Sequence, residues 1–363
     1  MLKSLHVKNF TVFEDAKFDF GPGLNVIVGA NGTGKSHVLK LGYAVMQARY
    51  KLGLPFTAVA ALGRVTFSKA DWQRVLADNL MGVFRPEGIG RLARRRKSGG
   101  HNRTEVKLEF ERSKASIEFS FSTRSQTDVA LEKIPEGKFE SVAPVFIPTK
   151  ELLSLFPGLP SLYNAYALSI DQTYPDLCER LATPLLNGPK LTQVRDLLKP
   201  LEGMIHGTVK NQGGRFYLLV EDIGRLEIEL VAEGIRKLAT LAYLLNNGSL
   251  KATTTLFWDE PEANLNPQLL VKLAEILALL ARQGFQIVLA THSLFLLKQL
   301  HILSRESPTP LNYFSLVGDQ FGEPTQVETA DELPMLPGIV ALEAEMEQAD
   351  TFLDVLNKDD EDV

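Results

Sequence analysis

A glycine-rich segment that ends in lysine and serine, GANGTGKS, occupies residues 29–36. Its spacing fits G-x-x-x-x-G-K-[ST], the phosphate-binding loop of nucleotide-binding proteins, and it lies between an apolar run and a segment of helical period. Glycines permit the tight turn that points backbone N–H groups at phosphates, and the positive end of the next helix faces the same anion. The residues predicted to bind nucleotide are Gly29, Asn31, Gly32, Thr33, Gly34, Lys35, Ser36 and His37.

A second apolar run, residues 255–258, ends in two carboxylates, Asp259 and Glu260. With a phosphate loop elsewhere in the chain, this is the pattern of a Walker B strand, and it predicts ATP and Mg²⁺ as the ligands. Lys35 is expected to reach the β- and γ-phosphates, while Ser36 and Asp259 are expected to hold Mg²⁺. Glu260 is the expected catalytic residue, which accepts a proton from the attacking water or orients it.

A third apolar run, residues 286–290, is followed by Thr291, His292 and Ser293. A histidine at the end of such a strand is placed to sense or stabilise the γ-phosphate, so His292 is the second expected catalytic residue. The structural alternative is a histidine that caps the helix expected from Leu294.

These residues need strands and helices to position them. The expected strands are 5–7, 18–20, 24–28, several within 105–147, 215–220, 226–231, 255–258 and 286–290. The expected helices are 35–50, 71–80, a region at 150–206 broken by six prolines, 233–245, 267–282 and 294–303. Strands that alternate with helices toward the C-terminus indicate a parallel α/β sheet.

Composition excludes several classes of protein. The chain has 363 residues, of which 45% are hydrophobic and 23% charged, as is typical of globular proteins. Its one cysteine, Cys178, excludes an internal disulfide and a cysteine-rich metal site. The longest apolar run, Ile276–Ala281, is far shorter than the roughly 20 residues that span a bilayer, and no secretory signal is recognisable. We therefore expect a cytoplasmic protein without a membrane partner.

The net charge of −5 conceals two opposite segments. Residues 85–103 carry a balance of +6, and residues 343–363 a balance of −8. The basic segment is a candidate for contact with DNA phosphates, although a solvated loop is the commoner role of such a run. The acidic segment overlaps most of an expected amphipathic helix, 340–356, and continues beyond it as a tail.

Five pieces of sequence, in order, resemble the ATP-binding-cassette (ABC) type of ATPase head: LHVKNFTVFEDAKFDF, GANGTGKS, VAEGIRKLATL, WDEPEANLNP and LATHS. The resemblance is to the SMC, RecF and OLD-like branch of soluble, AAA_21-like P-loop ATPases. It implies an α/β P-loop fold with a mixed sheet, a β-rich insertion and a helical lobe. It divides the chain into an ATPase lobe I (1–150 and 250–340), a helical signature lobe II (151–249), and an acidic C-terminal helix and tail (341–363).

The resemblance also implies a head-to-tail homodimer, or a higher assembly, with ATP between subunits. The residues then expected to contact the partner's nucleotide are Glu233, Gly234, Arg236 and Asn264. The family commonly has Ser-Gly-Gly where this chain has Ala232, Glu233 and Gly234, so a hydroxyl is missing and an acid is present. Such a site also has a glutamine loop, for which Lys150 is the candidate here.

Spacing separates the branches of this family. Lys35 and Asp259 are 224 positions apart, more than the resemblance implies for a transporter subunit and too few for the coiled-coil arms of SMC proteins. We expect a switch ATPase whose ATP-dependent dimer controls DNA transactions or a separate effector, such as a nuclease, in repair or phage defence. The alternative is a scaffold that holds ATP with negligible turnover.

Overall fold

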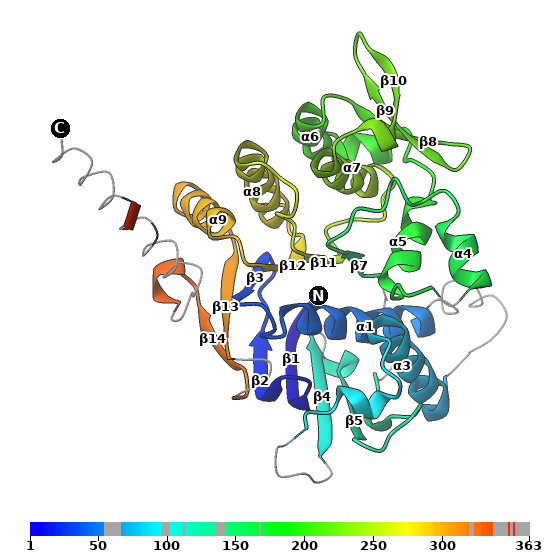
Figure 1. Ribbon diagram of the computed structural model, residues 1–363, viewed down its shortest axis with the longest axis vertical. Helices are drawn as coiled ribbons and strands as arrows, with labels where there is room; N and C mark the ends of the chain where they lie inside the picture. Colours follow the sequence, from blue (N-terminus) through cyan, green and yellow to red (C-terminus); the bar gives the residue numbers. More distant parts are fainter. Residues whose placement is uncertain are drawn as a thin grey trace.

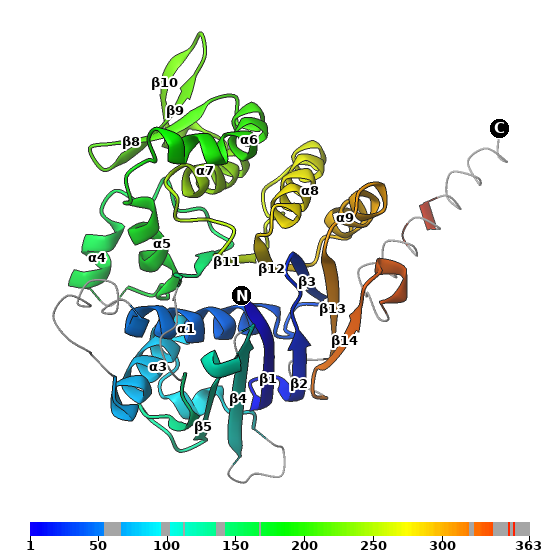
Figure 2. The same ribbon diagram turned by 180° about the vertical axis from the view of Figure 1, so that it is seen from behind.

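The computed structural model describes residues 1–53, 67–95, 102–111, 113–135, 142–166, 168–318, 323–336, 348 and 351–352. Two expectations concern residues outside these ranges: the side chains of Arg96 and Lys97, and nearly all of the C-terminal helix and acidic tail. The described residues form two larger sheets, one small sheet and the helices that cover them (Figures 1 and 2).

The central sheet contains six described strands in the order β14-β13-β3-β12-β11-β7. They are β3 (Leu24–Gly29), β7 (Val145–Ile147), β11 (Thr255–Asp259), β12 (Gln286–Thr291), β13 (Leu311–Val317) and β14 (Gln326–Ala330). Neighbours are parallel except β13 and β14, so the sheet is mixed, as predicted. Every residue of β7, β11 and β12 is buried, which is why these strands are continuous apolar runs in the sequence.

The second sheet is antiparallel, with its described strands in the order β2-β1-β4-β5-β6. They are β1 (Leu2–Phe10), β2 (Phe13–Asp19), β4 (Arg103–Phe110), β5 (Ile117–Ser122) and β6 (Ala130–Lys133). Residues 105–147 were expected as a β-rich insertion, but because β4 pairs directly with β1, most of this segment completes a sheet that the N-terminus begins. The last strand expected in that segment, β7, belongs instead to the central sheet.

Helix α1 (Lys35–Gly53) lies between these two sheets (Figure 1). A Cβ atom on Gly42, in the middle of α1, would lie 2.9 Å from Phe257 in β11 and 3.8 Å from Leu2 in β1. Helices α8 (Pro267–Arg282) and α9 (Leu294–Glu306) follow β11 and β12. They cover the other face of the central sheet, because Ile287 and Leu289 share a core with α8 while Val288 and Ala290 share one with α1.

Helix α3 (Lys69–Phe84) packs on α1 and is longer at both ends than the predicted 71–80. Its start is set by a capping box, in which the Ser68 side chain accepts from the Asp71 N–H and the Asp71 carboxylate accepts from the Ser68 N–H. Its end is set by Arg85 in the left-handed conformation, with φ of 51°. Both signals lie outside the apolar periodicity from which the helix was predicted.

Residues 151–249 contain α4 (Leu159–Ala165), α5 (Thr173–Leu181), α6 (Pro189–Met204) and α7 (Glu233–Asn246). This segment also carries a small antiparallel sheet of β8 (Thr208–Gln212), β9 (Arg215–Val220) and β10 (Gly224–Glu227), at one end of the molecule in Figures 1 and 2. Pro200 lies inside α6, so the expectation that this proline breaks the helix was wrong. The strand predicted to end at residue 231 ends at Glu227, and a 3₁₀ turn, Ile228–Leu230, follows it.

The predicted division into lobes stays a proposal. Leu177 of α5, Leu201 of α6 and Leu244 of α7 share one continuous apolar cluster with the strands of the central sheet. A separate cluster fills the space between the two larger sheets around α1 and α3. None of the described helices is long and apolar enough to cross a membrane.

Candidate functional site

The phosphate-binding loop joins β3 to α1, and two of its glycines are required by close packing. A Cβ atom on Gly29 would lie 2.6 Å from the Leu316 carbonyl oxygen, and one on Gly34 would lie 2.6 Å from a methyl group of Val12. Gly34 also has a φ of +97°, which side chains rarely tolerate. The Thr33 hydroxyl donates to the Ala30 carbonyl at 2.9 Å and closes the loop. The sequence pattern therefore folds into the compact loop it predicts.

Lys35 folds back over this loop. Its ammonium donates to the carbonyl oxygens of Gly29 and Ala30, at 2.7 and 2.9 Å, and the residue is only 7% exposed. Burial lowers the pKa of Lys35, while the nearby carboxylates of Glu260, Asp259 and Glu262 act in the opposite direction. A buried ammonium above a glycine-rich loop is suited to binding an anion.

Ser36 and Asp259 meet at the end of β11, where the Ser36 hydroxyl donates to Asp259 Oδ1 at 3.1 Å. Burial raises the pKa of Asp259, partly offset by this hydrogen bond. A hydroxyl and a carboxylate are the hard oxygen donors that Mg²⁺ prefers, with substrate phosphates and water completing its shell. The pair therefore fits Mg²⁺, although the described residues contain no group of three or more acidic, His or Cys side chains suited to a metal ion.

The two residues predicted to be catalytic lie together beyond β11 and β12. The His292 Nδ1 atom is 3.5 Å from Glu260 Oε1. The His292 side chain is 52% exposed, so it is accessible to a substrate. The helix that follows is capped by Ser293, whose hydroxyl accepts from the Leu296 N–H. The capping role that was the alternative for His292 therefore belongs to its neighbour.

Glu262 is a site residue that the sequence did not single out. It is 8% exposed, and its Oε1 accepts from the Thr291 hydroxyl at 2.7 Å and from the His292 N–H at 3.0 Å. The same oxygen is 3.4 Å from His292 Nδ1. Glu262 therefore fixes the backbone that carries His292. The sequence held one indication of this role. Glu262 is the third acid of the segment WDEPE, in which a predicted strand ends at the site.

Of the four residues expected to contact a partner's nucleotide, Glu233 and Gly234 begin α7, and Asn264 lies against Gly234 from the loop after β11. A Cβ atom on Gly234 would lie 2.6 Å from the Asn264 carbonyl, so only glycine permits this approach of α7 to the loop after β11. Arg236 instead binds within its own chain, because its Nε is 2.9 Å from Glu151 Oε1 and its Nη1 donates to the Val231 carbonyl.

Among the residues that the structure describes, neither Lys150 nor His37 has contacts that indicate nucleotide binding. Lys150 is exposed, and the contact with α7 is made by the next residue, the buried Glu151. The ring of His37 lies 6.0 Å from the ring of Phe84. Burial lowers the pKa of His37 to about 4, so its side chain is neutral at pH 7 and supplies no positive charge to a phosphate. Roles in nucleotide binding stay predictions for both residues.

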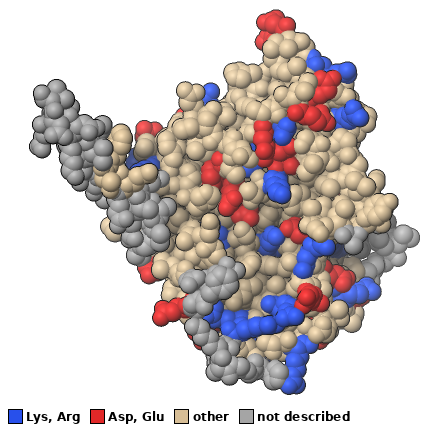
Figure 3. All heavy atoms as spheres, in the orientation of Figure 1, with Lys and Arg blue, Asp and Glu red and all other residues tan. Residues whose placement is uncertain are grey.

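Much of the basic segment 85–103 binds its own chain. The Arg85 guanidinium donates to the carbonyls of Leu168 and Ile170, and Arg94 donates to the Val12 carbonyl at 2.6 Å. Residues Ile89–Leu92 form a 3₁₀ turn in which Ile89 and Leu92 are buried, so the expectation of an exposed loop was wrong for this part. Figure 3 shows Lys and Arg side chains gathered across the lower part of one face, with Asp and Glu side chains beside them.

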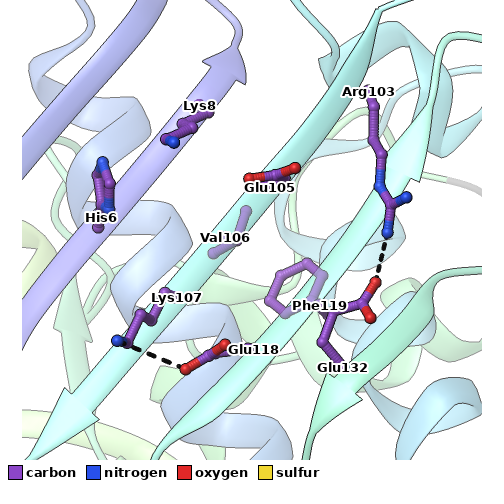
Figure 4. A pocket seen from close by; sticks show the side chains of 9 residues that line it. All are labelled: His6, Lys8, Arg103, Glu105, Val106, Lys107, Glu118, Phe119 and Glu132. Carbon is purple, nitrogen blue, oxygen red and sulfur yellow. Dashed lines mark hydrogen bonds and ion pairs between the residues drawn. The ribbon is translucent and has the colours of Figure 1, made fainter.

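A hollow on the outer face of the antiparallel sheet is separate from these motifs. Figure 4 shows its side chains projecting from β1, β4, β5 and β6, and none is a predicted nucleotide-binding or catalytic residue, although Arg103 ends the basic segment 85–103. Arg103 pairs with Glu132, and Lys107 lies 3.5 Å from Glu118. Since these positive charges face negative ones within the hollow, it does not resemble an anion site.

Comparisons with known proteins agree with the geometry. A family model described as "AAA domain, putative AbiEii toxin, Type IV TA system" matches residues 24–298, and another AAA-domain model matches residues 4–41. The DNA double-strand break repair Rad50 ATPase of Archaeoglobus fulgidus is 44% identical over 52 residues, which is 14% of this chain and 6% of that protein. The DNA replication and repair protein RecF of Lactococcus lactis subsp. cremoris is 46% identical over 39 residues, 11% of each chain. The matched stretches are thus small parts of both relatives.

Solved SMC heads share the fold over nearly the whole chain. An SMC head bound to the C-winged helix domain of ScpA has a TM-score of 0.55 at 14% identity, covering 91% of this chain and 97% of that one. An SMC head with an extended coiled coil, bound to the C-terminal domain of ScpA and derived from Pyrococcus furiosus, has a TM-score of 0.51 at 11% identity, covering 98% and 99%. These likenesses confirm the predicted fold class. The chain belongs to the AAA_21 family, whose model matches residues 24–298, and it has the fold of an SMC head.

Proposed function

We propose that this chain binds and hydrolyses ATP as a molecular switch. The observation that carries the proposal is the convergence of three motifs at one edge of the central sheet. Lys35 and the loop amides are placed for phosphates, Ser36 and Asp259 for Mg²⁺, and Glu260 with His292 for hydrolysis. Three independent sequence patterns meet there because β3, β12 and β11 are adjacent parallel strands.

Phosphate binding is the task of the loop and of Lys35. The ammonium now bonded to Gly29 and Ala30 exchanges these carbonyls for phosphate oxygens, and the N-terminus of α1 adds its positive dipole. Ser36 and Asp259 would hold Mg²⁺, which would neutralise negative charge on the β- and γ-phosphates.

Hydrolysis is the task of Glu260 and His292. Glu260 accepts a proton from the attacking water, whose oxygen forms a bond to the γ-phosphorus while the bond to the bridging oxygen of ADP breaks. His292 Nδ1 lies 3.5 Å from Glu260 Oε1. The backbone N–H of His292 donates to Glu262, so His292 connects the two carboxylates. The exposed ring is in turn available to the γ-phosphate.

A second copy of the chain completes the site in this proposal. The start of α7 and Asn264 form one surface, in which Gly234 allows close approach. ATP closes the dimer and hydrolysis opens it, and DNA or an effector protein responds to closure. The family description, which includes a toxin of a toxin–antitoxin system, and the names of the two repair relatives support a role in defence or DNA repair.

The proposal is tested by multiple-turnover phosphate release. The purified chain with MgATP is expected to release many phosphates per chain, and EDTA is expected to stop release because Ser36 and Asp259 lose their metal. Both are measured with a phosphate sensor. Release of no more than one phosphate per chain would instead favour the scaffold alternative, which the missing signature hydroxyl at Ala232 makes a real competitor.

Contact with DNA is tested in the basic segment. Arg94 is kept because it bonds the Val12 carbonyl. Replacing Arg95, Arg96 and Lys97 by Gln is expected to weaken DNA binding at low salt and to reduce the slope of log affinity against log salt by up to about 2.7, at ~0.9 per phosphate contact. Fluorescence anisotropy measures both. The matched control replaces three exposed lysines elsewhere, Lys199, Lys210 and Lys272. Equal affinity for variant and control would remove this segment as a DNA contact.

A further inference from the structure

Lys237, on the first turns of α7, is a buried charged residue without an assigned role. It is 1% exposed, and its ammonium donates to the main-chain carbonyl of Glu260 in a long hydrogen bond of 3.4 Å. Lysine side chains are almost never fully buried unless a partner compensates the lost water. The partner here is the backbone of the residue proposed as the general base.

Glu260 has a backbone that needs such support. Its φ is +48°, in the left-handed region that residues with a side chain seldom occupy, and such a conformation persists only where its surroundings hold it. The Glu260 N–H donates to the Ala290 carbonyl at 2.9 Å, and the Glu260 carbonyl accepts from Lys237. The peptide group before this residue is therefore held by β12. The carbonyl after it is held by Lys237 of α7 together with the Ala263 N–H, which donates to the same oxygen at 3.2 Å.

The charges around Lys237 support the same role. Glu260 and Glu262 both approach His292 Nδ1, at 3.5 and 3.4 Å, so two carboxylates lie close together in a partly buried place. Burial lowers the pKa of Lys237, while Glu233, Glu262, Glu260 and Glu151 all act to raise it. A positive charge at this point offsets the mutual repulsion of the two carboxylates.

We propose that Lys237 is a positioning residue for hydrolysis: from α7 it holds the Glu260 peptide in its left-handed conformation and so aims the carboxylate at the attacking water. Lys237 touches neither substrate nor metal in this role. The inference rests on the proposed function, in which Glu260 is the base.

The contrasting explanation is that Lys237 only stabilises the packing of α7. Loss of packing lowers the melting temperature and disturbs the whole site, including Gly234 and the loop at Asn264 against which it packs. Loss of positioning acts on kcat alone, because the phosphate loop and Lys35 are held by other contacts. The two explanations therefore differ in how kcat and nucleotide affinity change.

The experiment compares Lys237→Met, Lys237→Gln and wild type in the full chain. Met keeps the length and removes the donor and charge, and Gln keeps a neutral donor. With Met, kcat for ATP is expected to fall by about tenfold or more while KM and the affinity for fluorescent ATP change by less than about twofold. Gln is expected to give an intermediate kcat, and it decides the question if the Met variant does not fold. Lys272→Met is the matched control. Lys272 is an exposed residue of α8, so this variant should behave as wild type.

A double-variant cycle separates this inference from the function on which it rests. In a Glu260→Gln chain, adding Lys237→Met is expected to lower kcat no further, because there is no base left to aim. Unchanged kcat in the single Lys237 variants, or a parallel loss of kcat and nucleotide affinity, would overturn the positioning role. If Glu260→Gln itself leaves hydrolysis unchanged, it is the proposed function that fails.

Discussion

Replacing Glu260 with Gln is expected to lower kcat for ATP hydrolysis by at least about 100-fold, because a general base contributes roughly 10²–10⁴-fold. ATP affinity should remain, since the proposed phosphate contacts are made by Lys35 and the loop, and the amide keeps the shape of the carboxylate. The variant should also accumulate as an ATP-bound dimer, because closure no longer leads to hydrolysis. Phosphate release, fluorescent-ATP titration and sedimentation velocity measure the three effects.

A control for this substitution is available one helix away. Glu275, on α8, is exposed, and Glu275→Gln makes the same chemical change outside the site. It should hydrolyse ATP at the wild-type rate and dissociate after turnover. Equal phosphate release by Glu260→Gln and Glu275→Gln would reject Glu260 as the base, and a Glu260→Gln chain that stays monomeric with MgATP would reject the dimer switch.

Replacing Lys35 with Met is expected to weaken ATP binding between about 10- and 100-fold, since hydrogen bonds to charged groups contribute about 1.5–3 kcal/mol and each 1.4 kcal/mol is tenfold. The loss has a specific origin here. The buried Lys35 ammonium donates to the carbonyl oxygens of Gly29 and Ala30, within the phosphate-binding loop itself. Methionine fills the same volume and offers no donor to a phosphate.

Titration with a fluorescent ATP analogue measures this loss, and the melting temperature shows whether the loop still folds. Lys272→Met removes one positive charge from the exposed face of α8 and should bind ATP as wild type does. If Lys35→Met bound the ATP analogue within twofold of this control, the loop amides alone would account for phosphate binding.

The chemical motifs were readable because each is local in sequence. GANGTGKS is one turn between a strand and a helix, and Asp259 and His292 each follow an apolar strand directly or within two residues. Their convergence could also be predicted, because the carboxyl ends of parallel strands meet at one edge. The ends of α3 were predicted less well, since the capping box at Ser68 and the left-handed Arg85 lie outside the apolar pattern.

Pairing between distant strands was beyond local patterns. Residues 105–147 are predicted from the sequence as a β-rich insertion, yet β4 pairs with β1 across about a hundred positions. Alternation of apolar and polar residues shows that a strand has one buried face, but it does not name the strand beside it.

The sequence by itself determined the phosphate loop, the two carboxylates at the end of β11 and the histidine after β12, because chemistry at fixed spacing leaves few alternative structures. Only the tertiary structure decided what supports them. Glu262 holds the backbone of His292, and Lys237 reaches the Glu260 carbonyl from a helix more than twenty residues earlier. The physical reason is that burial and contact, not residue type, convert an ordinary lysine or glutamate into part of a site, and both are properties of the folded chain.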